Sequence, residues 1–155
     1  MGMIHIIKET DNSLEQLINR ISKEYEVQSF DYYDAIDYLT EFKKEGAVTL
    51  LEYKAASEIS TEFVDVANAL LNYHVRPILL VTDIEGMDAD ALKDAATVLT
   101  NVWSGNENDG LGYQVVYYDE ANDVSFRDPE GPKEEGITDV LDAIMREDEW
   151  PYMGD

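Results

Sequence analysis

Apolar and polar residues alternate along the chain in two patterns. Short apolar runs predict β-strands, and apolar stripes that recur every three or four residues predict helices. The strand-like runs cover residues 4–7, 27–30, 47–53, 78–83 and 113–118. The helical stripes lie between them, at residues 14–25, 35–42, 63–71 and 92–103. Strands that alternate with helices of this length predict parallel pairing through right-handed crossovers.

This alternation favours an α/β fold: a three-layer, doubly wound, mostly parallel sheet of the flavodoxin or receiver type. Strand order 2-1-3-4-5 is a common order for such a sheet. The run 78–83 is apolar on both of its faces, as expected for a strand that helices cover on both sides.

Polar residues at the predicted helix starts indicate where each helix begins. Asn12 with Glu15 has the spacing of a capping box, in which each side chain satisfies a free backbone N–H. Asp31 or Asp34 suits the start of the second helix, and Asp88 or Asp90 suits the start of the fourth. Gly46 occupies a position typical of a helix end.

The chain changes character after the fifth predicted strand. Residues 119–123 predict a turn, after which Val124–Arg127 return as an antiparallel strand at the sheet edge. A last helix is expected from about Thr138, followed by an acidic tail that contains aromatic residues. We expect one domain over residues 1–155, with residues 119–155 forming an acidic C-terminal extension that packs on the domain or docks from it.

Composition excludes several classes of protein. The chain has 34 Asp and Glu residues against 11 Lys and Arg, which gives a formal net charge of −23. Such a charge is unsuited to direct contact with nucleic-acid phosphates or with anionic membranes. There is no cysteine, so disulfides, thiolate catalysis and Cys-ligated zinc are excluded. No signal peptide or membrane span is indicated, and a cytoplasmic location is expected.

The turn after the first strand argues against nucleotide or flavin binding. Phosphate-binding folds place glycines in this turn, so that backbone amides approach the phosphate. Residues 9–13 contain no glycine and two acids. No cofactor is therefore expected.

A few residues at the predicted strand ends can be compared with a known family. The first strand ends in Lys8-Glu9, the third reaches Glu52, the fourth ends at Thr82, and Tyr118-Asp119 follows the fifth. Over residues 4–118 the element order resembles the receiver domains of two-component signalling. Thr82 matches that family's hydroxyl position. The paired acids, the phosphoacceptor Asp and the Lys-Pro pair are replaced, so the resemblance implies a pseudo-receiver, a scaffold that binds partners without phosphotransfer.

Acidic residues cluster after the fourth strand. Asp83, Glu85 and Asp88 could hold Mg²⁺ or Ca²⁺ through their oxygens. The alternative is structural, because Gly86 suits a turn and Asp88 suits a helix N-cap. The structural interpretation is preferred, since four acids close together, counting Asp90, are unremarkable in so acidic a chain.

Charge becomes denser toward the C-terminus. Residues 1–46 sum to −5, residues 47–118 to −8 and residues 119–155 to −10. Tyrosines and tryptophans embedded among acids are typical of interfaces, where they anchor a partner. Tyr32, Tyr33 and Tyr38 lie outside clear core stripes. The residues assigned to partner binding are Tyr117, Tyr118, Glu147, Asp148, Glu149, Trp150 and Tyr152.

The sequence therefore predicts a non-catalytic acidic protein-interaction or inhibitor module. The expected partner is a basic protein, which this chain would bind as a nucleic-acid mimic or as an immunity-type protein. A homodimer is a further alternative. The acidity could instead adapt the protein to a salty interior, or serve solubility alone. The alternative function is a divalent-metal-dependent or receiver-like phosphotransfer domain that uses Asp83 and the neighbouring acids.

Overall fold

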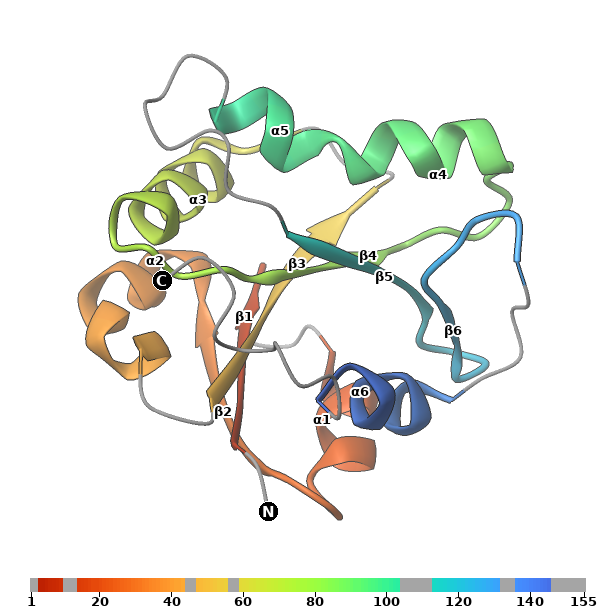
Figure 1. The fold of residues 1–155 in the computed structure, drawn as a ribbon, viewed down its shortest axis with the longest axis horizontal. Helices are drawn as coiled ribbons and strands as arrows, with labels where there is room; N and C mark the ends of the chain where they lie inside the picture. Colours follow the sequence, from red (N-terminus) through yellow and green to blue (C-terminus); the bar gives the residue numbers. More distant parts are fainter. Residues whose placement is uncertain are drawn as a thin grey trace.

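One six-stranded sheet forms the centre of the molecule (Figure 1). The computed structural model describes residues 3–9, 14–43, 47–55, 59–103, 113–131 and 136–145. Its strands are β1 (Met3–Lys8), β2 (Glu26–Asp31), β3 (Ala47–Lys54), β4 (Ile78–Thr82), β5 (Gln114–Asp119) and β6 (Val124–Phe126). Their order in the sheet is β2-β1-β3-β4-β5-β6. The first five strands are parallel, in the common order 2-1-3-4-5. Strand β6 pairs antiparallel with β5, which confirms the predicted hairpin.

Helices cover both faces of the sheet and complete a three-layer, doubly wound fold of the flavodoxin or receiver type. One face carries α1 (Glu15–Ile21) and α6 (Ile137–Met145). The other face carries α2 (Tyr32–Ala35), the 3₁₀-helix η1 (Ile36–Lys43), α3 (Thr61–Asn72), α4 (Ala89–Ala96) and α5 (Val98–Trp103). The predicted fold class is therefore confirmed.

Alternate residues of the strands belong to the two hydrophobic cores, because successive side chains of a strand point to opposite faces. The core beneath α1 and α6 contains Leu50, Leu80 and Val116. Two positions further along the same strands, that face carries Glu52, Thr82 and Tyr118. The sheet register thus gathers two polar side chains and a tyrosine where β3, β4 and β5 end.

Several helix boundaries differ from the predicted ones. The capping box at Asn12 is wrong, because α1 begins at Glu15 with Leu14 as its N-cap, at a left-handed φ of 61°. The stripe at 92–103 is divided at Thr97 into α4 and α5. Ile36, assigned to an inward stripe, is 37% exposed, because η1 replaces regular helix and is kinked at Tyr38.

Other predicted boundaries are confirmed. The Asp31 carboxylate accepts a hydrogen bond from the Asp34 backbone N–H at 2.7 Å at the start of α2. The Asp88 carboxylate accepts from the Ala91 N–H at 2.8 Å at the start of α4. Gly86, at a left-handed φ of 80°, turns the chain just before α4. The predicted helix end at Gly46 lies outside the described residues.

Strand β6 and helix α6 belong to the packed part of the chain. Ile137, Val140, Leu141 and Ile144 join the core beneath α1 and α6, and Phe126 joins the opposite core. Residues 146–155 lie outside the described residues, and the assignment of domains stays a prediction. Among the described helices, none is both long and apolar enough to cross a membrane.

Candidate functional site

An acidic cleft lies at the edge of the sheet where the parallel strands end. In open α/β sheets this edge is where ligands bind. The cleft has a volume of about 470 Å³ and is formed by the ends of β3, β4 and β5 and by the residue before α1. Its charged lining consists of Glu52, Asp83, Glu85, Asp119 and Glu120 together with Lys54. The excess of carboxylates favours a cationic ligand over an anionic one.

Glu52 lies in the wall of this cleft and connects three strands. Its side chain is buried, with the residue only 1% exposed. One carboxylate oxygen accepts a hydrogen bond from the Glu9 backbone N–H at 2.9 Å, and the other accepts from the Thr82 hydroxyl at 3.2 Å. The Tyr32 hydroxyl donates to the Glu52 carbonyl oxygen. Glu52 therefore holds the ends of β1, β3 and β4 together.

The environment of Glu52 shifts the pKa of its carboxyl. Burial raises the pKa of the Glu52 carboxyl above its ordinary value of 4.5. The hydrogen bond from the Glu9 backbone, the positive charge of Lys54 and the Thr82 hydroxyl oppose this shift. Lys54 itself forms an ion pair with Glu9, with 3.2 Å between the ammonium nitrogen and a carboxylate oxygen.

The loop after β4 does not assemble the metal site that the alternative function would use. Asp83 and Glu85 line the cleft, whereas the Asp88 carboxylate is used as the N-cap of α4. Within the part of the chain that the structure describes, no group of three acidic or histidine side chains is placed to hold a metal ion. The structure therefore does not bring Asp83, Glu85 and Asp88 together as ligands.

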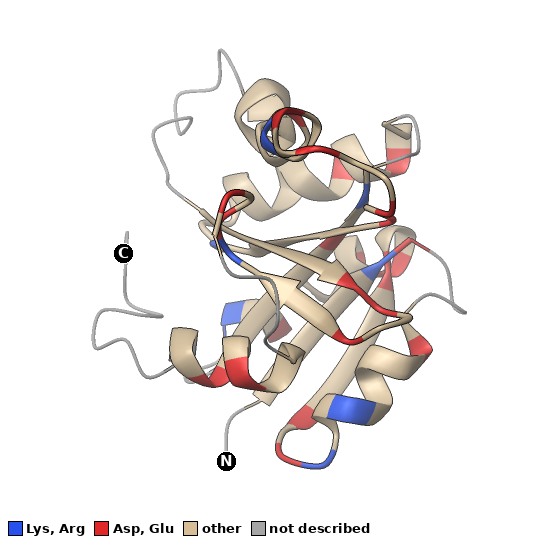
Figure 2. Cartoon of the chain, turned by 90° about the vertical axis from the view of Figure 1, so that its right-hand side faces the viewer, with Lys and Arg blue, Asp and Glu red and all other residues tan. Residues whose placement is uncertain are grey.

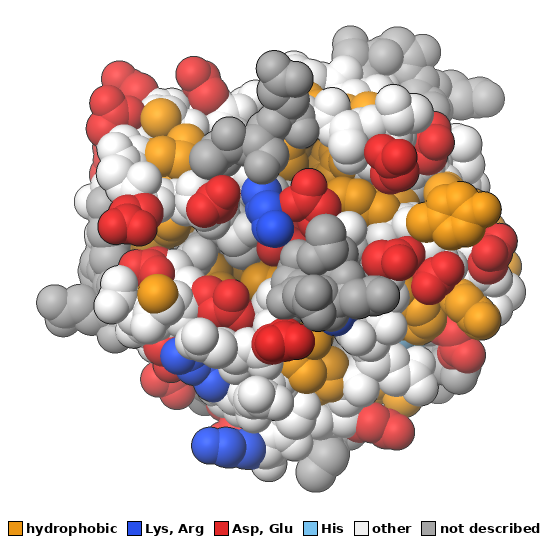
Figure 3. Space-filling model, turned by 180° about the vertical axis from the view of Figure 1, so that it is seen from behind, with side chains coloured by type: hydrophobic (Ala, Val, Ile, Leu, Met, Phe, Trp, Pro, Cys, Tyr) orange, Lys and Arg blue, Asp and Glu red, His pale blue; other side chains and the backbone are white. Residues whose placement is uncertain are grey.

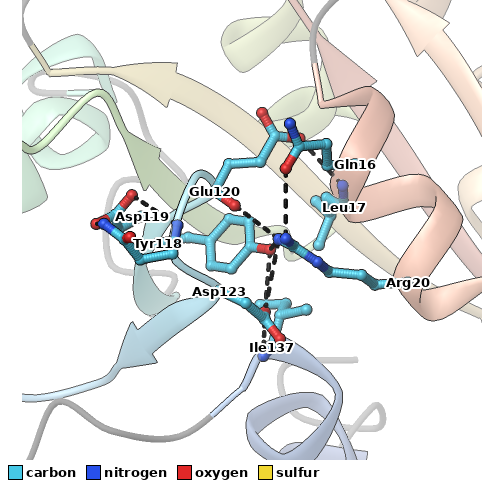
Figure 4. A network of polar contacts seen from close by, with 9 residues as sticks. Gln16, Leu17, Arg20, Tyr118, Asp119, Glu120, Asp123 and Ile137 are labelled. Carbon is cyan, nitrogen blue, oxygen red and sulfur yellow. Dashed lines mark hydrogen bonds and ion pairs between the residues drawn. The ribbon is translucent and has the colours of Figure 1, made fainter.

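A polar network next to the cleft fixes the β5–β6 turn against α1 and α6 (Figure 4). The Arg20 guanidinium donates to the Tyr118 hydroxyl at 2.5 Å and to the Glu120 carbonyl oxygen at 2.7 Å. The Glu120 carboxylate accepts from the Leu17 backbone N–H at 3.0 Å. It thereby supplies the cap that Leu14 cannot give to α1.

Asp123 is the centre of the same network. Its carboxylate accepts hydrogen bonds from the Tyr118 hydroxyl at 3.1 Å and from the Ile137 backbone N–H at 3.2 Å. The same oxygen lies 3.8 Å from the Arg20 guanidinium. A single carboxylate thus joins α1, the end of β5 and the first residue of α6.

Of the predicted partner-binding residues, the structure describes Tyr117 and Tyr118, and both are buried. Tyr117 is 2% exposed, stacks on Phe126 at 5.1 Å between ring centres, and donates its hydroxyl to the Leu92 carbonyl oxygen at 3.2 Å. Tyr118 is fully buried, and burial raises the pKa of its hydroxyl. Neither ring is available to a partner at the surface. The remaining predicted residues, Glu147, Asp148, Glu149, Trp150 and Tyr152, lie outside the described residues.

Charged and aromatic side chains are distributed unevenly over the described surface. Figure 2 shows Asp and Glu on the helices and turns around the sheet, with few Lys and Arg among them. Figure 3, which views the molecule from behind, shows hydrophobic side chains bordered by acidic ones at its right, the side of the molecule where α2 lies (at the left in Figure 1). Tyr33 is 75% exposed and Tyr38 is 51% exposed. Among the described residues, the exposed tyrosines thus lie at α2 and η1 and, with Tyr73, at the end of α3, rather than at β5.

Comparison with known proteins gives structural likeness only. No family model and no curated protein matches this sequence. Among solved structures, the crystal structure of FixJ-N matches with a TM-score of 0.47 and 10% identity, covering 93% of this chain and 90% of that one. A low-resolution structure of the response regulator StyR matches with a TM-score of 0.41 and 15% identity, covering 92% of this chain and 57% of that one. Both TM-scores are low, so the fold assignment rests on the topology of the sheet itself.

Proposed function

We propose that this protein is a non-catalytic acidic module that binds a basic protein partner, as an interaction or inhibitor protein. The observation that carries the proposal is the cleft at the carboxyl ends of the strands, whose lining holds Asp83, Glu85, Asp119 and Glu120, besides the buried Glu52, against one lysine. Lys54 is already paired with Glu9, so the cleft offers an incoming group mainly negative charge. A basic side chain of a partner fits this environment, and the net charge of −23 would speed its approach.

The residues at this edge also support the absence of phosphotransfer. Glu52 stands where the resemblance to receiver domains places an aspartate, and both of its carboxylate oxygens accept hydrogen bonds from the protein itself. Thr82, the matching hydroxyl, is one of the donors. A pseudo-receiver that uses this edge for binding accounts for both features.

The test is a titration with a basic probe at increasing salt. Oligolysine is titrated into the protein, and the Kd is measured by calorimetry at several NaCl concentrations. We expect binding at low salt that weakens as salt rises, because screening reduces the attraction between exposed charges. The double variant Asp83→Asn and Glu85→Gln removes two exposed carboxylates from the cleft and should raise the Kd about three- to tenfold, as expected for weakened rim charges.

A matched control separates the cleft from the net charge. Glu24→Gln with Glu26→Gln removes the same charge from exposed positions at the opposite end of the sheet, where β2 begins. These variants should leave the Kd close to that of the wild type. Equal effects of the two double variants would reject the cleft as the binding site. Transfer of a phosphoryl group to the protein from acetyl phosphate with Mg²⁺ would reject the non-catalytic assignment.

A further inference from the structure

Exposed apolar side chains are concentrated on one short segment. Among the described residues, five large hydrophobic side chains are exposed, and three of them fall within residues 33–38. Tyr33 is 75% exposed, Tyr38 is 51% exposed and Ile36 is 37% exposed. The inward positions of the same segment, Tyr32 and Ala35, are buried. The outward face of α2 and η1 therefore carries aromatic and apolar side chains although it faces solvent.

Tyr38 is supported from below by a cluster of rings. Its ring centre lies 5.5 Å from that of Phe30, which in turn lies 5.2 Å from that of Phe42 in an edge-to-face arrangement. Phe42 is 5% exposed. The kink at Tyr38, with φ −122° and ψ 29°, separates this residue from regular helix. A ring held in this way loses little side-chain freedom when a partner covers it.

Carboxylates alternate with these apolar residues. Asp31, Asp34 and Asp37 lie within one to three positions of Tyr33 or Tyr38. Asp34 and Asp37 are exposed, and neither forms an ion pair with any residue that the structure describes. The segment therefore offers aromatic faces next to carboxylates that have no cation beside them in the described part of the chain.

We propose that this α2–η1 surface, formed by Asp31, Tyr33, Asp34, Ile36, Asp37 and Tyr38, docks an arginine-bearing segment of the basic partner. This inference rests on the proposed function and names the side chain that the partner supplies. A guanidinium stacks on an aromatic ring and pairs with a neighbouring carboxylate through its planar fork of donors. A lysine ammonium offers only a point charge, so the combination of tyrosine and aspartate favours arginine.

Charge also decides between the possible occupants of this surface. A second copy of the chain, docked face to face, would bring the same three aspartates against each other, which repels. An acidic or neutral partner would leave the carboxylates unpaired at a buried contact, which carries a large desolvation cost. A basic partner avoids both costs.

The test compares arginine with lysine on the same protein. Two synthetic peptides of equal length and charge, one alternating arginine with glycine and one alternating lysine with glycine, are titrated at low salt and their Kd values are measured. We expect the arginine peptide to bind more tightly. Tyr33→Ser and Tyr38→Ser should each weaken the arginine peptide about two- to fivefold and leave the lysine peptide almost unchanged. Tyr33→Phe keeps the ring and should restore the affinity for arginine.

The control is Tyr73→Ser, which removes an exposed tyrosine at the end of α3, where Tyr73 is 39% exposed. This variant should affect neither peptide, and the melting temperatures of Tyr33→Ser, Tyr33→Phe and Tyr73→Ser should match the wild type. Tyr38→Ser loses the ring contact with Phe30 and should melt slightly lower while remaining folded.

The outcomes separate this inference from the proposed function. If the lysine peptide binds in a salt-dependent way and Tyr33→Ser leaves the arginine peptide unaffected, the α2–η1 surface is rejected and the proposed function stands. If neither peptide binds the wild type at low salt, both are rejected. If sedimentation shows a wild-type dimer that Tyr33→Ser dissociates, the surface belongs to a second copy, which also overturns the inference.

Discussion

At the scale of single residues, Glu52 determines the chemistry of the strand ends. A buried carboxylate is costly unless it accepts hydrogen bonds, and here the Glu9 N–H and the Thr82 hydroxyl both donate to it. Because of these contacts, the free energy of unfolding depends on whether the Glu52 carboxyl is protonated. The sequence places Glu52 at a strand end, but its burial follows from the register of β1, β3 and β4, which local patterning does not specify.

Glu52→Gln should therefore change how stability depends on pH. Because burial raises the pKa of Glu52 in the folded state, the folded protein holds this proton more tightly than the unfolded chain does. The free energy of unfolding should fall as pH rises from the ordinary value of 4.5 through the folded pKa. The glutamine variant lacks this loss, and its amide can still accept from Glu9 and donate to the Thr82 oxygen. The stability of the variant relative to the wild type should thus increase with pH across that window and then stay constant.

Urea unfolding at a series of pH values measures this difference. Glu24→Gln at an exposed position controls for the loss of one negative charge anywhere in the protein. A relative stability of Glu52→Gln that declines as pH rises would show that the ionised carboxylate is net stabilised in the fold, contrary to expectation.

At the scale of elements, the hydrophobic pattern predicted every strand and the layer of helices, because period and run length are local properties. The pattern did not predict helix boundaries that depend on contacts between residues far apart in the sequence. The start of α1 depends on Glu120, which lies 103 residues away from Leu17, and no local signal marks that contact. The break between α4 and α5 at Thr97 interrupts one continuous apolar stripe.

The candidate site was predictable only in part, for the same reason. The rule that ligands bind at the carboxyl ends of parallel strands points to the edge where the cleft lies. The sequence suggested Tyr117 and Tyr118 as surface anchors because they are aromatic residues outside clear core stripes and embedded among acids. Adjacent residues of a strand point to opposite faces, and helices cover both faces here, so both rings are buried. Exposure at Tyr33 and Tyr38 depends on the short α2 and the kink in η1.

The network around Asp123 gives a test at this scale, because one carboxylate joins α1, β5 and α6. Asp123→Ala removes the acceptor for the Tyr118 hydroxyl and the Ile137 N–H, and should lower the free energy of unfolding by about 1–3 kcal/mol. Asp123→Asn should cost less, since its amide oxygen still accepts and asparagine tolerates the left-handed φ of 50°. Chemical denaturation measures both variants.

Asp94→Ala is the matched control for that experiment, because it makes the same chemical change on the exposed face of α4. Its effect should stay within about 0.5 kcal/mol. A cost at Asp123 no larger than at Asp94 would mean that the turn between β5 and β6 holds α6 without this carboxylate.

At the scale of the whole molecule, the net charge of −23 acts on folding and on binding in opposite directions. The compact state brings carboxylates closer together than the unfolded chain does, so their repulsion destabilises the fold. The same carboxylates attract a basic partner from a distance. Local ion pairs such as Lys54 with Glu9 and Lys93 with Glu130 offset the repulsion only near their own positions, because exposed pairs contribute little.

Salt should therefore stabilise the protein while weakening its binding of a basic probe. Raising NaCl shortens the screening length to about 10 Å at 0.1 M, which reduces repulsion within the fold and attraction to the partner together. Urea unfolding at increasing NaCl should show a rising free energy of unfolding, with choline chloride giving the same increase because screening does not depend on the identity of the cation. An effect of sodium that choline fails to reproduce would indicate specific ion binding. Stability that falls with either salt would mean that attractive ion pairs outweigh the repulsion, and the acidic surface would then contribute to the fold rather than oppose it.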